Sequence, residues 1–400
     1  MAKSRKSRVK GFLLESSSPS FCLRISYLCI FLTLMNSPQQ ATGCYTPIFA
    51  FGDSLTDAGN YLELYPHLIP QEKIPHFFLP PNGDTYFHHP TGRCCDGRLM
   101  IDFFAEYFGL PHLPTYFGGK NKSSSRNFEY GVNFAVVGSP VLDISFYEQK
   151  GMVYPWPYSM KDQLNWFKDL LPILCRSSSC NELKQRALVI FGPFGANDYN
   201  NEYFGGTSRE EIRSLVPLVA QGLASAELIE AGMETIMVPG MVPDGCLPQP
   251  LSSNRDHPTT TGCIGWLNDL MISHNKMLQK ELDQVRNHHP HASIIYADYY
   301  NSAMQLYHSA QEYGFNGRTF IACCGGGGPY NYNFTAECGD PLTTSCLDPS
   351  IFVNWDGAHF TEAANRWMSK AILEGPYTFP RITTSCISSV ACDGSQLHTS

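Results

Sequence analysis

Two short segments, far apart in the 400-residue sequence, contain the side chains that nucleophilic acyl transfer requires. The first, residues 51–60, contains Ser54 directly after a short apolar run. The second, residues 355–360, places Asp356 and His359 three residues apart. A serine hydroxyl is a poor nucleophile at neutral pH, so it needs a base to accept its proton and a carboxylate to hold that base in one tautomer. The residue types therefore predict a serine hydrolase in which Ser54 attacks, His359 is the base and Asp356 orients it.

Each segment also has an ordinary structural explanation. A serine before a helix is a common N-cap, and Asp-x-x-His pairs also cap turns. The predicted strand before Ser54 places its hydroxyl at the carboxyl edge of the sheet, where a following helix would direct N–H groups to the same point. The remaining histidines have no comparable setting. The loop-like ones are predicted to lie on the surface without a metal; they are His88, His89, His288, His289 and His291.

Acyl transfer also needs hydrogen-bond donors for the oxyanion. Residues 133–139 end one predicted strand and residues 191–200 end the next. Gly138 offers a backbone N–H without side-chain obstruction, and Asn197 offers a side-chain amide. Glycine and asparagine are also ordinary turn residues, but their position at successive strand ends favours a shared role as oxyanion donors.

The elements that must position these residues alternate along the chain. Apolar runs predict five strands at residues 47–51, 131–137, 188–191, 235–238 and 293–296. Apolar residues at three- and four-residue steps predict a long amphipathic helix over 264–285, and further helices over 100–108, 162–174, 208–231 and 361–372. Strands that alternate with helices indicate an α/β fold with a parallel sheet covered on both faces. Its functional loops then lie at the carboxyl ends of the strands.

Three long segments interrupt this alternation, at residues 62–98, 242–261 and 323–354. They are rich in turn signals, and insertions of this kind commonly rim a pocket and shape its specificity. The sequence has no internal repeat and no second domain is predicted. We expect one domain over residues 44–380, followed by a loosely ordered tail at 381–400.

The N-terminus differs from the rest of the chain. A basic head is followed by the apolar stretch 21–35, which is too short to span a bilayer comfortably. This pattern predicts a secretory signal peptide over residues 1–43, with cleavage near residues 41–44. The mature chain is then secreted, extracellular or vacuolar, with no stable membrane span. A misassigned start, an uncleaved anchor and a plastid-type transit peptide remain open alternatives.

Cysteine content agrees with an oxidising compartment. Of 15 cysteines, three close pairs predict small disulfide loops, namely Cys175/Cys180, Cys338/Cys346 and Cys386/Cys392. The odd total leaves one thiol free or linked elsewhere, and no zinc-ligand spacing is present. Asn121 and Asn333 begin N-glycosylation sequons, which matter only if the chain is exported.

Composition limits the classes of partner. The net charge is −8 and only 16% of residues are charged, whereas a nucleic-acid-binding domain carries clustered basic residues. No nucleic-acid partner is therefore predicted, and the oligomeric state stays open.

Over residues 45–376 the chain resembles a plant member of the GDSL esterase/lipase family, within the SGNH hydrolase superfamily. Four segments carry the resemblance: the nucleophile block at 51–60, the oxyanion-glycine block at 133–138, a Gly-x-Asn-Asp block at 195–198 and the closing Asp-x-x-His block at 356–359. The Gly-x-Ser-x-Gly elbow of the other large hydrolase fold is absent. Departures are modest: Ala196 and Pro140 replace smaller or more flexible residues, and Asp244 stands where an apolar residue is common.

The resemblance implies a three-layer α/β/α, flavodoxin-like fold with a five-stranded parallel sheet. It also implies Ser54 as nucleophile, His359 as base and Asp356 as its partner. The oxyanion hole would consist of the backbone N–H groups of Ser54 and Gly138 and the side chain of Asn197. No cofactor is implied.

These inferences together predict a secreted serine esterase that hydrolyses a small-molecule carboxylic ester through an acyl-enzyme. The resemblance extends to a plant subgroup with esterases of choline esters and acetylated alkaloids, which favours an acetyl or aryl-acyl ester of a specialised metabolite, while long-chain lipid remains open. Two alternatives are an acyltransferase that passes the acyl group to an alcohol and a non-catalytic binding or cell-wall glycoprotein.

Overall fold

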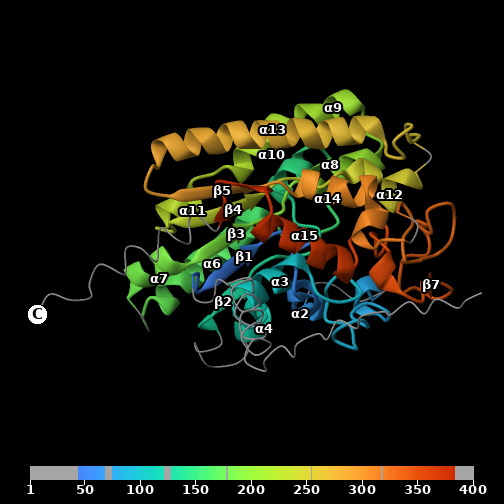
Figure 1. Cartoon of the computed structure of the whole chain (residues 1–400). Helices are drawn as coiled ribbons and strands as arrows, with labels where there is room; N and C mark the ends of the chain where they lie inside the picture. Colours follow the sequence, from blue (N-terminus) through green and yellow to red (C-terminus); the bar gives the residue numbers. More distant parts are fainter. Residues whose placement is uncertain are drawn as a thin grey trace, which may run out of the picture. The chain divides into compact units, whose positions relative to one another are not determined.

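A six-stranded sheet forms the centre of the computed structural model, which describes residues 44–67, 74–120, 128–176, 179–253, 255–316 and 319–382 (Figure 1). The strand order is β2-β1-β3-β4-β5-β8. Five strands are parallel: β1 (Ile48–Phe51), β2 (Gly131–Asn133), β3 (Leu188–Phe191), β4 (Thr235–Pro239) and β5 (Ser293–Ala297). The sixth, β8 (Thr378–Phe379), runs antiparallel to β5 at the edge. The five predicted strands are confirmed, and the short edge strand is an addition.

Strand β2 is shorter than predicted, since it ends at Asn133 rather than at residue 137. The Asn133 side chain accepts a hydrogen bond from the backbone N–H of Ala135 at 2.9 Å, and it donates to the Thr56 carbonyl at 2.7 Å. This local turn takes the chain out of the sheet toward the carboxyl end of β1. The residues beyond it thus approach Ser54.

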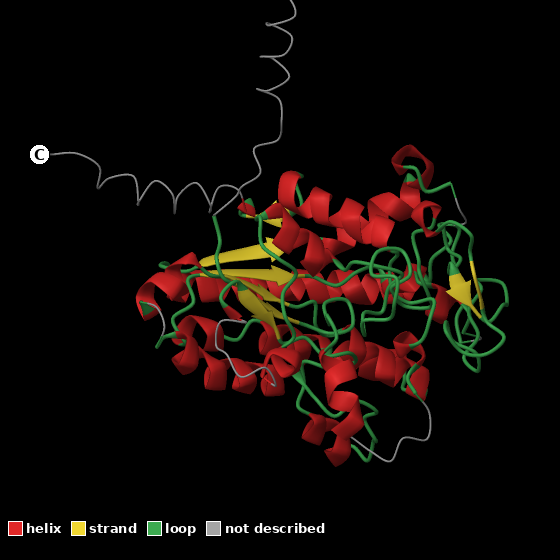
Figure 2. Ribbon diagram, turned by 90° about the horizontal axis from the view of Figure 1, so that it is seen from below, coloured by secondary structure: helices red, strands yellow, loops and turns green. Residues whose placement is uncertain are grey.

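Alternating residues of the strands enter two separate cores, one on each face of the sheet. Phe49 and Phe51 of β1 pack into one cluster, and Ile48 and Ala50 pack into the other. The first face is covered by α6 (Met160–Leu174), α10 (Val216–Leu223) and α13 (Gly265–His288). The second is covered by α3 (Met100–Tyr107), α14 (Tyr299–His308) and α15 (Glu362–Glu374) (Figures 1 and 2). The predicted three-layer α/β/α fold is confirmed.

Shorter elements connect these layers. The helices are α2 (Asn60–Leu64), α4 (Tyr116–Lys120), α5 (Ile144–Gln149), α7 (Cys180–Arg186), α8 (Ala196–Gly205), α9 (Arg209–Ser214), α11 (Glu227–Glu230) and α12 (Pro248–Leu251). A small second sheet pairs β6 (Cys324–Gly325) and β7 (Thr344–Ser345) antiparallel. The single helix predicted over residues 208–231 is wrong, because three helices occupy that range. Pro217, in the first turn of α10, has no N–H for a continuing helix and so favours a new start there.

The same range, Arg209–Glu230, has the length and hydropathy of a membrane span within the described part of the chain. Its apolar residues Val216, Val219 and Leu223 are nevertheless buried in the core on one face of the sheet. Helices that pack into the core of a folded domain account for this composition.

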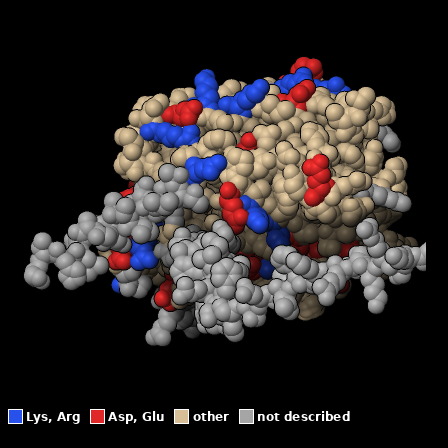
Figure 3. Space-filling view, viewed as in Figure 1, with Lys and Arg blue, Asp and Glu red and all other residues tan. Residues whose placement is uncertain are grey.

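On the face shown in Figure 3, acidic and basic side chains are interspersed and neither sign forms a large continuous patch.

Disulfide bonds constrain two of the three predicted insertions, at residues 242–261 and 323–354. The pair Cys175–Cys180 is confirmed, and Cys246–Cys263 is a further bond. The predicted pair Cys338/Cys346 is wrong, because Cys338 bonds Cys324 and Cys346 bonds Cys323. Neighbouring side chains of an extended segment point to opposite sides, so the adjacent Cys323 and Cys324 each reach a different partner. The prediction for Cys386/Cys392 lies outside the described residues.

A buried ion pair joins the first insertion to α3. The Arg93 guanidinium donates to both carboxylate oxygens of Asp102 at 2.9 and 2.8 Å, and it also donates to the carbonyl of Ala58 at 3.0 Å. The side chains of Arg93 and Asp102 are only 7% and 1% exposed. Arg93 therefore ties the turn that follows Ser54 to the body of the domain.

Replacing Arg93 with methionine should lower the free energy of unfolding by about 3–5 kcal/mol, because Asp102 stays buried without its partner. Urea unfolding followed by circular dichroism measures this loss. The matched control is Arg366→Met, because Arg366 is 61% exposed where it pairs with Glu362; its loss should stay within about 1 kcal/mol. Equal losses for the two variants would contradict this assignment.

Candidate functional site

Ser54 lies in a tight turn at the carboxyl end of β1. The carbonyl of Asp53 accepts hydrogen bonds from the backbone N–H groups of Thr56 and Asp57, at 3.0 and 2.9 Å. Gly52, just before the turn, has a φ of +149°, a conformation that side-chain-bearing residues rarely adopt. The next helix, α2, begins only at Asn60, so the expected helix directly after Ser54 is replaced by this turn.

Asp356 and His359 lie in a second tight loop, just before α15. Trp355 donates its backbone N–H to the carbonyl of His359 at 2.8 Å, which closes the loop. One carboxylate oxygen of Asp356 accepts the backbone N–H groups of Ala358 and His359 at 2.8 and 2.9 Å. The buried Trp355 anchors the loop through its indole N–H, which donates to Asn82 Oδ1 at 2.9 Å.

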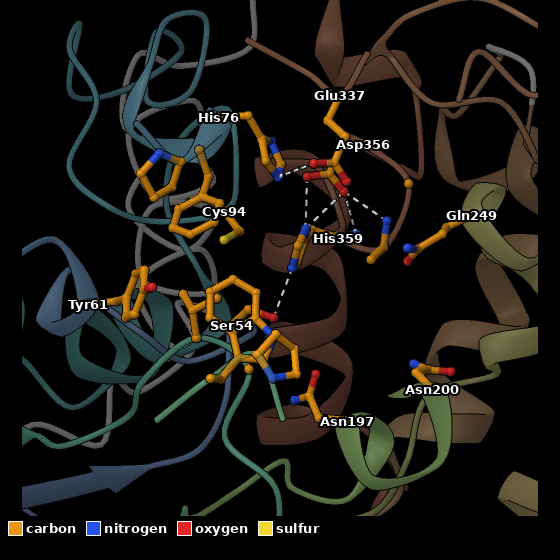
Figure 4. A pocket seen from close by; sticks show the side chains of 18 of the residues that line it. Ser54, Tyr61, His76, Cys94, Asn197, Asn200, Gln249, Glu337, Asp356 and His359 are labelled. Atoms are coloured by element: carbon orange, nitrogen blue, oxygen red, sulfur yellow. Dashed lines mark hydrogen bonds and ion pairs between the residues drawn. The ribbon is translucent and has the colours of Figure 1, made fainter. Parts of the chain in front are cut away.

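The fold brings Ser54, His359 and Asp356 together (Figure 4). His359 Nε2 lies 2.9 Å from Ser54 Oγ, and His359 Nδ1 lies 2.9 and 2.8 Å from the two carboxylate oxygens of Asp356. An ionised carboxylate only accepts, so Nδ1 carries a proton and Nε2 is left to accept from the serine hydroxyl. This is the geometry required of a nucleophile, a base and an orienting acid.

The environment of His359 sets its basicity. Burial by itself lowers the pKa of His359, but the charge of Asp356, the neighbouring Cys94 and the hydrogen bond to Asp356 together outweigh burial, so the pKa is held well above its ordinary value. Burial likewise raises the pKa of Asp356, yet its interaction with His359 prevails and the net pKa is lowered. Asp356 therefore stabilises the imidazolium that forms when His359 Nε2 accepts a proton.

Three candidate oxyanion donors lie in the same pocket as Ser54. Within the described residues, the backbone N–H groups of Ser54 and Gly138 donate to no protein acceptor. The Asn197 amide nitrogen, in the first turn of α8, lies 3.3 Å from both Asp53 Oδ2 and the carbonyl of Ser139, which are long for such hydrogen bonds. All three groups line one pocket with the Ser54 hydroxyl, which makes them candidates to bind the oxyanion of an acyl transfer.

Sequence reasoning missed two side chains that hold this arrangement. Gln163 of α6 accepts from the N–H of Gly52 at 3.0 Å and donates to the Gly52 carbonyl at 2.8 Å and to Ser139 Oγ at 3.0 Å. Asp57 accepts from the N–H of Val137 at 2.9 Å. Both side chains therefore join the turn that contains Ser54 to residues 137–139, which contain Gly138. Gln163 is fully buried, and only the structure shows its contacts with these distant segments.

Buried carboxyls flank the oxyanion side. Asp53 is 3% exposed and burial raises its pKa to about 7, although the Leu55 N–H donates to it at 3.0 Å. Burial likewise raises the pKa of Asp244 to about 7; its side chain accepts from the Asn200 amide at 3.1 Å. Asp244, which stands where an apolar residue is common in the family, therefore supports Asn200, a residue of α8 that lines the pocket.

Cys94 was also missed by sequence reasoning. Cys94 and Cys95 form no disulfide within the described chain, so at least these two thiols are free. The Cys94 side chain lines the pocket near His359, and burial raises the pKa of its thiol (Figure 4). The described residues contain no group of three His, Cys, Asp or Glu side chains arranged to hold a metal ion.

The pocket that contains these residues has a volume of about 610 Å³. Its rim comes from the first and third insertions, which supply His76, Phe77, Tyr332 and Glu337, as predicted for such loops. His76 links the two insertions, because its Nδ1 lies 3.0 Å from the Cys338 carbonyl and its Nε2 lies 3.4 Å from Glu337. Figure 4 shows Tyr61 on one side of the Ser54–His359 pair, and Gln249 and Asn200 on the other.

Of the two predicted glycosylation sequons, only the one that begins at Asn333 lies within the described residues. Asn333 is exposed, and its side-chain oxygen accepts the hydroxyl of Thr335 at 2.9 Å. Asn121 lies outside the described residues, as does the predicted signal peptide over residues 1–43.

Comparison with known proteins identifies relatives along most of the chain. Residues 48–372 match the family model described as GDSL-like Lipase/Acylhydrolase. GDSL esterase/lipase At2g27360 of Arabidopsis thaliana is 43% identical over 383 residues, which cover 93% of this chain and 95% of that protein. GDSL esterase/lipase At1g28600 of the same plant is 44% identical, covering 90% of this chain and 91% of the relative. The sinapine esterase of Brassica napus is 43% identical, covering 90% and 93%.

Proposed function

Because the chain belongs to the GDSL-like lipase/acylhydrolase family and is a carboxylic ester hydrolase, we propose that it cleaves small-molecule esters through Ser54, His359 and Asp356. The observation that supports these roles is the continuous hydrogen-bonded line from Ser54 Oγ through His359 to Asp356, with contacts of 2.9 and 2.8 Å. A serine that merely capped a helix would not need this alignment.

The reaction has two acyl transfers. Ser54 Oγ attacks the ester carbonyl carbon while its proton passes to His359 Nε2. The oxyanion forms beside the N–H groups of Ser54 and Gly138 and the amide of Asn197. When the intermediate collapses, His359 returns the proton to the leaving alcohol, and the acyl group stays on Ser54. Water then repeats the attack with His359 as base, which releases the carboxylic acid and restores the serine.

The substrate proposed is a small specialised-metabolite ester with an acetyl or aryl-acyl group. The cavity of about 610 Å³ has the size of a small-molecule site, and one relative is named a sinapine esterase. Hydrolysis rates for acetyl, aryl-acyl and long-chain esters of one alcohol test this assignment, and product analysis with added alcohols measures transfer. Fastest turnover of the long-chain ester would contradict a small-molecule substrate, and ester products would indicate an acyltransferase.

The pH dependence should follow His359. Protonated His359 cannot accept the serine proton, so kcat/KM should fall about tenfold per pH unit below its pKa. Because Asp356 raises that pKa, the midpoint should lie above the ordinary value of about 6.5. The measurement is a kcat/KM profile from about pH 5.5 to about pH 9. Asp356→Asn removes the stabilising charge and should move the midpoint downward, besides lowering the rate. A flat profile would remove His359 as the base.

We further propose passage through the secretory pathway, since four disulfides link described cysteines. The leader over residues 1–43 and glycans on Asn121 and Asn333 remain predictions. N-terminal sequencing and mass before and after glycan removal, on protein secreted by plant cells, test both.

A further inference from the structure

The two walls of the cavity differ in chemistry. One wall, here the aromatic wall, consists of Tyr61, Phe77 and Trp156. The rings of Tyr61 and Trp156 meet edge to face at 5.3 Å between centroids, and those of Tyr61 and Phe77 lie 6.0 Å apart. The other, the polar wall, consists of Asn200, Gln249 and Tyr332. Figure 4 places Tyr61 and the pair Gln249 and Asn200 on opposite sides of Ser54 and His359.

The aromatic wall adjoins the oxyanion side of the site. A Cβ added to Gly138 would lie 2.1–2.4 Å from atoms of the Trp156 ring, so the indole packs directly on this glycine. The Tyr154 hydroxyl donates to the Gly138 carbonyl at 3.1 Å and fixes the same turn. A substituent that extends from the ester carbonyl carbon toward this side of the pocket therefore contacts Trp156 first.

The polar wall adjoins the loop that carries His359. A Cβ added to Gly357, between Asp356 and His359, would lie 2.2 Å from the Tyr332 ring and 3.1 Å from Gln249 Cβ. The backbone N–H of Gln249 also donates to the Gly357 carbonyl at 2.8 Å. The leaving oxygen must receive its proton from His359 Nε2, so the alcohol part of an ester lies on the His359 side.

We infer that the aromatic wall binds an aryl group in the acyl part of the ester, and that the polar wall receives a small polar alcohol. This inference rests on the proposed function, because it orients the substrate from the roles of Ser54 and His359. Aromatic rings pack favourably edge to face or offset against other rings, and polar alcohols find hydrogen-bonding groups in Gln249 and Tyr332. The enzyme is thus selective for aryl-acyl esters of small alcohols over acetyl esters of aryl alcohols.

Two isomeric esters test the orientation directly. Methyl 3-phenylpropanoate carries its phenyl ring in the acyl part, and 2-phenylethyl acetate carries it in the alcohol. The wild type should hydrolyse the first with a kcat/KM at least tenfold higher than the second. Trp156→Ala should lower the ratio of these two values at least tenfold, whereas Trp156→Phe should keep most of it. Because the ratio is measured, general damage to the catalytic residues cancels.

Phe204→Ala is the matched control, since Phe204 lines the same pocket from α8 and not from the aromatic wall. It should change the ratio less than twofold. Should Trp156→Ala not fold, Phe77→Leu probes the same wall. Three results would overturn the orientation. The wild type could prefer 2-phenylethyl acetate, or Trp156→Ala could lose activity equally on both isomers. The enzyme could also hydrolyse neither isomer although its Ser54 still reacts with a fluorophosphonate. Failure of Ser54 to react at all would instead overturn the proposed function.

Discussion

Replacing Ser54 with alanine should reduce kcat for ester hydrolysis by about 10⁶-fold, close to the rate that the remaining oxyanion donors and binding alone supply. In the proposed mechanism Oγ forms the acyl bond, and its neighbour His359 Nε2 at 2.9 Å then has no hydroxyl proton to accept. The side chain is small and lies in a pocket, so the fold should be retained. Initial rates on an activated short-chain ester, with circular dichroism as a folding check, measure the effect. Ser145→Ala, on the exposed start of α5, is the control and should keep the wild-type rate.

His359→Ala should cost about as much as Ser54→Ala, and the double variant should be no slower than either single one. Residues that act as one unit lose their joint contribution when any essential member is removed. Additive losses would mean that the two side chains act separately. A His359→Ala enzyme that kept a tenth of the wild-type rate would show that another group accepts the serine proton.

Removal of the Asn197 amide should lower kcat by about 10²–10³, which corresponds to roughly 3–4 kcal/mol of transition-state stabilisation. Its nitrogen makes only long contacts, of 3.3 Å, with Asp53 and the Ser139 carbonyl, so it is available to donate more strongly to an oxyanion. The loss should appear mainly in kcat, because the negative charge develops after the substrate binds.

Steady-state kinetics of Asn197→Ala and of the isosteric Asn197→Asp measure this effect. Both variants lack the donor and both should be severely impaired while remaining folded. If Asn197→Ala kept more than about half of the wild-type activity, the amide would not be an oxyanion donor and the two backbone N–H groups would have to suffice.

Local patterns in the sequence predicted most of the fold. The five parallel strands and the long helix α13 follow from runs and periodicities that a single segment contains. The apolar periodicity of residues 208–231 continues past Pro217 and so predicts one helix, whereas the structure begins a new helix there. Hydrophobic pattern alone therefore gives the buried face correctly and the helix ends incorrectly.

The site was predictable where the chemistry narrows the choice of residues. Ser54 and His359 are 305 positions apart, yet acyl transfer needs both, and both lie at ends of elements that meet at one sheet edge. The disulfides linking Cys323 and Cys324 to their partners were not predictable, since spacing does not specify connectivity. Gln163 and Cys94 were missed for a related reason: their roles depend on contacts between distant segments that have no local signature.

The most direct test of the account is the residue that a fluorophosphonate modifies. Wild-type protein should react at Ser54, located by peptide mass mapping, with a rate that falls on acidification and in His359→Ala; Ser54→Ala should not react. A covalent adduct on a different side chain, or undiminished reaction after Ser54 is replaced, would contradict the proposal that this serine is the nucleophile.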